Sequence, residues 1–147
     1  MYEDIEVALP DEELKRADHL VYVSLKYTRT CDIMKNAIKR LISAFELSMI
    51  EYLEAMKKKR KISEVPLTVK ERALKVKSLI GSPVTKYMML YNLLKKIDKA
   101  EYTSTEEFRK NVTLTTKGPN SVNVKVENLY DYLEKTKSFV KFMKEKI

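Results

Sequence analysis

Residues 28–59, TRTCDIMKNAIKRLISAFELSMIEYLEAMKKK, decide the fold. Apolar or small side chains recur along this stretch at a spacing of four and three, which is the period of an α-helix. A single unbroken helix over residues 11–59 would be roughly 70 Å long, about twice the width of a compact domain of this size. Because β-branched and capping-type residues cluster at TRTCD (28–32), we expect a turn there and two helices, over about 11–28 and 31–59. One unbroken helix is the alternative.

The two helices are expected to bury one continuous seam. Its members are Leu20, Ser24, Tyr27, Cys31, Met34, Ile38, Leu41, Phe45, Ser48, Tyr52 and Ala55. The second helix is apolar over much of its circumference, so it must be covered on most sides. We therefore expect part of this seam to be exposed in the monomer and to form an interface, in a homodimer or with a partner protein. The interface residues are expected to be Met34, Ile38, Leu41, Phe45 and Tyr52.

The ends of several other helices carry clear chemical signals. Pro10, followed by three acidic residues, starts the first helix, because proline lacks an amide proton and acids suit a helix N-terminus. Thr68 and Glu71 are spaced as a capping box and predict a third helix, which should stop at Gly81. A fourth helix is expected over roughly 83–100.

The hydrophobic period changes near residue 112. Apolar and polar residues alternate on both sides of a turn-type sequence, which predicts a β-hairpin whose two edges stay open. Its buried face is expected to hold Val112, Leu114, Thr116, Val122, Val124 and Val126. Ser104 and Glu107 are spaced to cap a short turn of helix, and Asn128 to cap the last helix. The expected fold class is therefore all-α: a helical bundle of about five helices with one β-hairpin near residues 112–126.

Composition excludes several functional classes from this 147-residue chain. We expect one domain, 1–147, with residues 1–10 as an N-terminal tail. Two Gly residues cannot build a nucleotide-binding loop, and one Cys with one His cannot supply the four ligands of a structural zinc site. The acidic N-terminus and the lack of a long apolar run predict a cytoplasmic protein without membrane association. The absence of Gln and Trp beside abundant Lys and Glu is typical of hyperthermophile proteins.

Positive charge is concentrated in the middle of the chain. The net charge is +8, and residues 35–99 carry 16 basic and 6 acidic side chains, a difference of +10. If a short loop brings the basic residues of the second and third helices together, they offer nine positive charges to RNA or another polyanion. The alternative is an ordinary solvated surface or a contact with a partner protein. The nine candidates are Lys57, Lys58, Lys59, Arg60, Lys61, Lys70, Arg72, Lys75 and Lys77.

The order of the helices resembles that of HEPN domains, small prokaryotic helical bundles. The resemblance is carried by DEELKRADHLVYVSLKYTR (11–29), by the longer AIKRLISAFELSMIEYLEAM (37–56), and by the basic loop and helices that follow. HEPN ribonucleases carry an Arg followed four to six residues later by His. Here Arg109 is the best placed Arg, but the expected His position is filled within 112–116. The resemblance thus implies a member without that nuclease chemistry, which dimerises or binds a partner.

These observations favour a non-enzymatic binding module that contacts RNA, another polyanion or a partner protein. No complete set of nucleophile, base and orienting group can be assembled from the sequence, so we expect no catalytic residues, metal or cofactor. A helical homodimer or interaction scaffold without nucleic acid is the first alternative. A metal-independent ribonuclease that uses Arg109 is the second.

Overall fold

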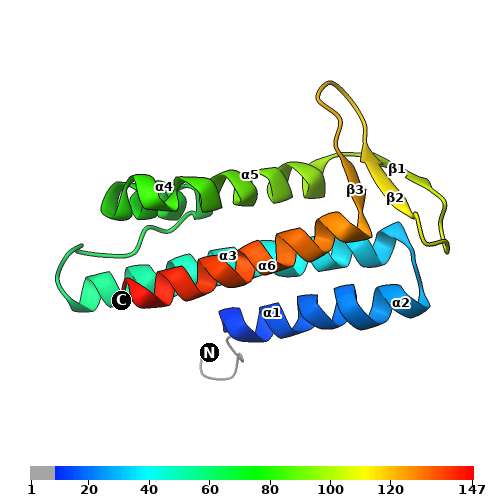
Figure 1. The fold of residues 1–147 in the computed structure, drawn as a ribbon. Helices are drawn as coiled ribbons and strands as arrows, with labels where there is room; N and C mark the ends of the chain where they lie inside the picture. The colour runs from blue at the N-terminus through cyan, green and yellow to red at the C-terminus, as the bar shows by residue number, and fades with distance from the viewer. Residues whose placement is uncertain (1–8) are drawn as a thin grey trace, which may run out of the picture.

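The computed structural model describes residues 9–147, which are mostly helical with a small antiparallel sheet at one end (Figure 1). The first helix is continuous through a π-helical turn, so residues 9–147 form five helices, as expected, when the short 3₁₀ segment is not counted. The sheet has three strands rather than the expected two. In chain order the elements are α1 (Pro10–His19), η2 (Leu20–Ser24), α2 (Leu25–Tyr27), α3 (Cys31–Lys58), α4 (Val69–Ile80), η3 (Ser82–Val84), α5 (Thr85–Lys99), β1 (Tyr102–Thr105), β2 (Thr113–Thr116), β3 (Asn123–Lys125) and α6 (Val126–Glu145).

Helix α3 is the centre of the molecule. It packs against α1, α4, α5 and α6, so that α1 lies on one side of the α3–α6 pair and α4–α5 lie on the other (Figure 1). Phe45 on α3 stacks on Phe139 of α6 with 4.4 Å between the ring centroids, and lies 5.5 Å from the ring of Tyr91 on α5. These rings are buried, and burial of large apolar side chains is the main stabilising contribution to such a core. In the described part of the chain, no helix combines the length and the apolar character that a membrane span requires.

The break between the first two helices lies where the sequence predicts it. Thr28 and Thr30 have extended backbone conformations, and α3 begins immediately afterwards at Cys31. The Thr30 hydroxyl accepts a hydrogen bond from the Ile33 amide at 3.4 Å, as expected of an N-cap. The prediction of two helices is confirmed, and the alternative of one unbroken helix is wrong.

The predicted seam is correct along α3 but wrong along the first helix. Tyr27 is 84% exposed, and the core residues of the first helix are Leu14, Ala17, Val21 and Leu25. Residues 28–30 are not helical and interrupt the helical phase, so the buried face of α3 does not determine which face of α1 is buried. The π-helical turn η2, in which the Leu25 amide donates to the Leu20 carbonyl, rotates the buried face further.

A buried carboxylate joins α1 to α3. Glu13 is 4% exposed, and it accepts hydrogen bonds from the Ser43 hydroxyl at 2.8 Å and from Arg40 at 3.3 Å, both on α3. Arg16 on α1 donates at 3.2 Å. Burial by itself raises the pKa of Glu13, but the hydrogen bonds from Ser43 and Arg16 and the positive charge of Arg40 outweigh it and leave the pKa below its ordinary value. Glu13 is therefore ionised and paired at neutral pH.

The predicted ends of α4 are confirmed, and the start of α6 needs a correction. The Thr68 hydroxyl accepts from the Glu71 amide at 3.1 Å, and α4 stops at Gly81, whose φ of 85° suits glycine. Helix α6 begins at Val126, before the expected cap at Asn128. The Asn128 side chain accepts from the Lys125 amide at 2.8 Å, so it caps the helix from within its first turn.

The hairpin is present as β2 and β3, with Leu114 opposite Val124. The expected turn of helix from Ser104 is wrong, because Ser104 lies in β1, which pairs with β2 and covers one of the edges expected to be open. Thr113, which alternates with the residues of the expected buried face, is itself buried beside β1. Glu107 does cap a helix, but a distant one: its carboxylate accepts from the Cys31 amide at the start of α3, at 3.2 Å.

Candidate functional site

The strongest concentration of unopposed positive charge lies where α3 ends. Lys57 and Lys58 form the last turn of α3, and Lys59, Arg60 and Lys61 continue into the loop with all five side chains exposed. The Arg60 amide donates to the Lys57 carbonyl at 3.0 Å and the Lys61 amide to the Met56 carbonyl at 2.9 Å, which is the hydrogen-bond pattern of a Schellman motif. This motif fixes the direction in which the basic run leaves the helix.

Arg60 occupies the position of this motif that glycine usually fills. Its φ is 61°, in the left-handed region that favours glycine. An arginine there costs conformational energy without adding to the packed core, since its side chain is exposed. The chain therefore keeps a positive charge at a position where folding alone favours glycine.

The remaining four predicted candidates lie on α4, at the same end of the molecule as the end of α3 (Figure 1). Lys70 and Lys77 are exposed, whereas Arg72 and Lys75 are half-buried. Arg72 donates to the carbonyls of Pro66 and Leu67 at 2.9 and 3.0 Å, so it holds the loop against α4. We name the nine predicted cations the basic end. Within residues 9–147, no hydrogen bond or ion pair joins its α3 part to its α4 part.

The basic end carries a large net charge. Residues 57–77 hold nine Lys or Arg and two acids, Glu64 and Glu71, which gives +7. Within residues 9–147, none of the nine cations is paired with an Asp or Glu side chain. Lys59 donates to the terminal Ile147 oxygen at 2.8 Å, which brings the end of α6 beside this surface. An uncompensated charge of this size attracts polyanions.

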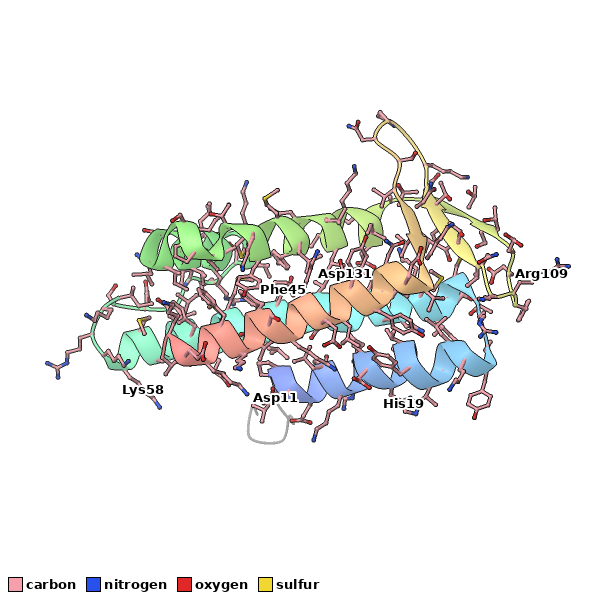
Figure 2. All side chains as sticks on the ribbon, viewed as in Figure 1. Asp11, His19, Phe45, Lys58, Arg109 and Asp131 are labelled. Atoms are coloured by element: carbon pink, nitrogen blue, oxygen red, sulfur yellow. The ribbon has the colours of Figure 1, made fainter. Side chains whose placement is uncertain are left out.

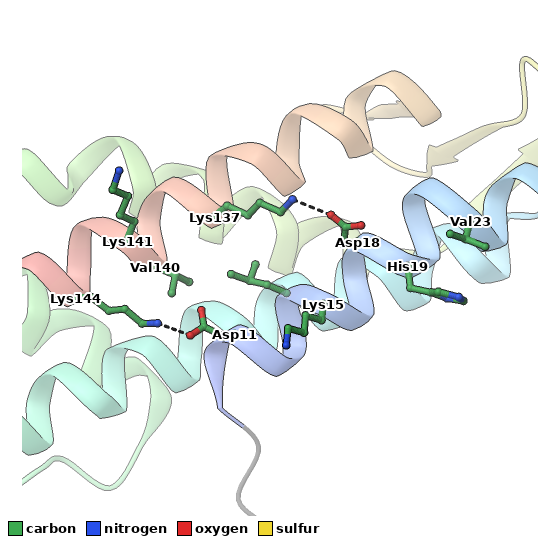
Figure 3. Close-up of a pocket in the computed structure, with 10 residues that line it drawn as sticks. Asp11, Lys15, Asp18, His19, Val23, Lys137, Val140, Lys141 and Lys144 are labelled. Carbon is green, nitrogen blue, oxygen red and sulfur yellow. Dashed lines mark hydrogen bonds and ion pairs between the residues drawn. The ribbon is translucent and has the colours of Figure 1, made fainter.

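A groove between α1 and α6 offers a second surface, of about 840 Å³ (Figure 3). Four lysines line it, but two of them are neutralised across the groove. Lys137 bonds Asp18 at 2.8 Å, which raises the pKa of Lys137, and Lys144 pairs with Asp11. Four lysines against two aspartates leave a charge difference of only +2. The full list of lining residues is Asp11, Leu14, Lys15, Asp18, His19, Val23, Lys137, Val140, Lys141 and Lys144.

The interface expected along α3 is wrong for the folded chain. The five residues are between 0 and 4% exposed, because α1, α5 and α6 cover the seam from three sides. They form the core of this chain and present no surface to a second molecule. The residues concerned are Met34, Ile38, Leu41, Phe45 and Tyr52.

The geometry brings no catalytic set together around Arg109. Its side chain points away from the molecule beside the sheet, whereas His19, the one histidine of the chain, lies on α1 (Figure 2). Cys31 is buried, and this burial raises the pKa of its thiol, which keeps it protonated at neutral pH. Among residues 9–147, no three His, Cys, Asp or Glu side chains lie together as metal ligands would.

The sheet end holds a smaller cationic pocket that the sequence reasoning missed. It has a volume of about 290 Å³, and its cations are Arg29, Lys110 and Lys125. They come from the α2–α3 turn, from the loop between β1 and β2, and from the end of β3. Because these segments are far apart in the sequence, no local pattern marks them as one site.

Comparisons with known proteins supply no relative. No family model, curated protein or solved structure matches the chain. The resemblance to HEPN domains therefore stays a prediction, and the functional argument depends on the surfaces described above.

Proposed function

We propose that this protein is a non-enzymatic module that binds RNA or a similar polyanion through its basic end. The observation that carries the proposal is the net charge of +7 over residues 57–77, with none of the nine cations paired to a carboxylate side chain within residues 9–147. Each phosphate that a lysine or arginine neutralises releases condensed counterions, so such a surface binds polyanions strongly at low salt.

The backbone at Arg60 supports the same proposal. A left-handed arginine at a helix end is less stable than glycine by about 1 kcal/mol. The fold gains no contact from this side chain, which is exposed. Binding of an anionic ligand provides a reason for the arginine, because Arg60 keeps the run of cations from Lys57 to Lys61 uninterrupted.

Neutralising part of the basic end tests the proposal. We would replace Lys57, Lys58 and Lys61 by Gln and measure binding of a dye-labelled 20-nucleotide oligo(U) RNA by fluorescence anisotropy. Each lost contact lowers the salt slope by about 0.7, which corresponds to about fivefold in affinity at 0.1 M salt, so the triple variant should bind about 100-fold more weakly.

A matched variant controls for net charge. Lys86, Lys99 and Lys117 are exposed lysines outside the basic end, and their replacement by Gln removes the same three charges. This control should bind the RNA within about threefold of the wild-type protein, since none of its three lysines belongs to the basic end and exposed charges are screened by salt. Equal losses in the two triple variants would show that binding is diffuse, and no binding by the wild-type protein at 20 mM salt would rule out the proposed function.

A further inference from the structure

We infer that the end of the molecule opposite the basic end is a stacking site for the bases of single-stranded nucleic acid. Figure 2 shows Lys58 and Arg109 at these two opposite ends, separated by the length of α3, which is about 42 Å for 28 residues. The inference deepens the proposed function, on which it rests, because it specifies the class of polyanion. It is carried by exposed aromatic rings on the segments that form the small cationic pocket beside the sheet, one of which, Tyr130, lines the pocket itself.

Phe108 is the central residue of this site. It is 72% exposed, whereas the other three phenylalanines of the chain are buried or partly buried. Its φ is 67°, so its backbone is in the left-handed region as well. The fold therefore carries two costs at this residue, an apolar ring in water and an unfavourable backbone conformation, and it gains no packing in return. Such a combination is found at functional sites.

The loop that carries Phe108 is fixed to the body of the protein. The Phe108 amide donates to the Arg29 carbonyl at 2.6 Å, and the neighbouring Glu107 carboxylate accepts from the Cys31 amide at 3.2 Å. Both bonds connect the loop to the α2–α3 turn. The ring is therefore presented on a backbone held at two points, which lowers the entropic cost of binding.

The adjoining pocket supplies positive charge for a phosphate. Arg29, Lys110 and Lys125 line it together with a single acid, Glu127, so its charged side chains sum to +2. Three other acids, Asp32, Glu106 and Glu107, belong to neighbouring segments and keep their negative charge, and two of them are fixed by hydrogen bonds. Glu107 accepts the Cys31 amide, and Asp32 accepts the Tyr102 hydroxyl at 3.3 Å.

Tyrosines complete the aromatic surface. Tyr130 lines the pocket and stacks on Tyr22 with 4.8 Å between the ring centroids and 18° between the ring planes. Both are about 40% exposed, and Tyr27, two residues before Arg29, is 84% exposed. Aromatic rings beside phosphate-binding cations are the combination by which proteins bind unpaired bases with little sequence preference. The basic end lacks such rings, so the two ends are chemically different.

Two probes of equal charge separate base stacking from phosphate binding. One is the oligo(U) 20-mer, and the other is an abasic 20-mer with the same number of phosphates. The wild-type protein should bind oligo(U) more tightly than the abasic strand. Phe108→Ala should bind oligo(U) about tenfold more weakly and leave abasic binding unchanged, since stacking on one ring contributes roughly that factor. Because Phe108 is exposed, this variant should fold as the wild-type protein does.

Control variants distinguish this inference from the proposed function. Met89→Ala removes an apolar side chain that is 67% exposed on α5 and should leave both affinities unchanged. The Gln variant of Lys57, Lys58 and Lys61 should weaken binding of both probes equally. If wild-type protein binds both probes equally, or if Phe108→Ala binds oligo(U) as the wild-type protein does, the stacking site is wrong while the proposed function stands. If Phe108→Ala changes only the sedimentation of the protein, the ring contacts another protein molecule and the stacking site is wrong. If neither probe binds the wild-type protein, both the stacking site and the proposed function are refuted.

Discussion

Replacing Arg60 by Gly should make the protein more stable and its binding of polyanions weaker. In the structure Arg60 has a φ of 61°, and its side chain lies in solvent. Glycine relieves the left-handed strain, about 1–2 kcal/mol, but gains freedom in the unfolded chain, which costs about 0.4–1 kcal/mol. The expected net gain is about 0.5–1 kcal/mol in the free energy of unfolding. For a chain of this size that raises the melting temperature by roughly 1–4 °C.

The same substitution removes one of the nine cations of the basic end. One phosphate contact contributes about 0.7 to the salt slope, so Arg60→Gly should bind oligo(U) RNA about fivefold more weakly at 0.1 M salt. Thermal unfolding followed by circular dichroism gives the stability, and fluorescence anisotropy gives the affinity. Both measurements use the full chain.

Arg60→Ala separates the two effects. Alanine removes the charge but keeps a Cβ in the left-handed region, so this variant should lose the same affinity without the gain in stability. A melting temperature for Arg60→Gly no higher than that of Arg60→Ala would refute the argument from strain. Unchanged RNA affinity in both variants would show that Arg60 contacts no phosphate.

Three further substitutions test the account of the fold. Glu13→Gln should lower the free energy of unfolding by about 1–2 kcal/mol at pH 7. Folding lowers the pKa of Glu13 below its ordinary value of 4.5, so this difference in stability should be complete above about pH 4.5 and should disappear as the pH falls through the folded-state pKa. Urea unfolding at several pH values measures it, and a difference that does not change with pH would contradict the role given to Glu13. Ser48→Ala should raise the free energy of unfolding by about 1 kcal/mol, because the buried Ser48 hydroxyl has no hydrogen-bond partner among residues 9–147. A lower free energy of unfolding in this variant would show that the hydroxyl does have a partner. Tyr91→Phe should lower the free energy of unfolding by about 1 kcal/mol, because the Tyr91 hydroxyl donates to Glu46 at 2.7 Å. An unchanged free energy of unfolding would show that this hydrogen bond adds nothing to stability.

Local chemistry explains which parts of the fold could be predicted from the sequence. The break before α3 and the two ends of α4 depend on side chains within a few residues of the helix terminus, such as Thr30, Thr68 and Gly81. A capping hydrogen bond joins residues about three apart, so the sequence alone contains it. The alternation of the hairpin is equally local.

Long-range competition explains the parts that could not be predicted. Ser104 and Glu107 have the spacing of a capping box, but the segment around Ser104 pairs with β2 and Glu107 caps α3 across 76 positions of sequence. The buried face of α1 is likewise set by α3 and by the π-helical turn, neither of which the spacing of its own residues reveals.

The candidate sites divide in the same way. The basic end was visible because its cations lie in two short runs of sequence within residues 57–77. The stacking site was not visible, because the fold assembles it from residues between Tyr22 and Tyr130. What distinguishes Phe108 from a core residue is its exposure and its backbone conformation, and both are properties of the folded chain.

The salt dependence of RNA binding by the wild-type protein tests the central claim most directly. The measurement is the affinity for the oligo(U) 20-mer at NaCl concentrations from 50 to 300 mM. If between four and nine cations of the basic end contact phosphates, the logarithm of the association constant falls against the logarithm of salt concentration with a slope between about −3 and −6. A slope near zero, or the absence of binding at 50 mM NaCl, would contradict the claim that this surface binds a polyanion.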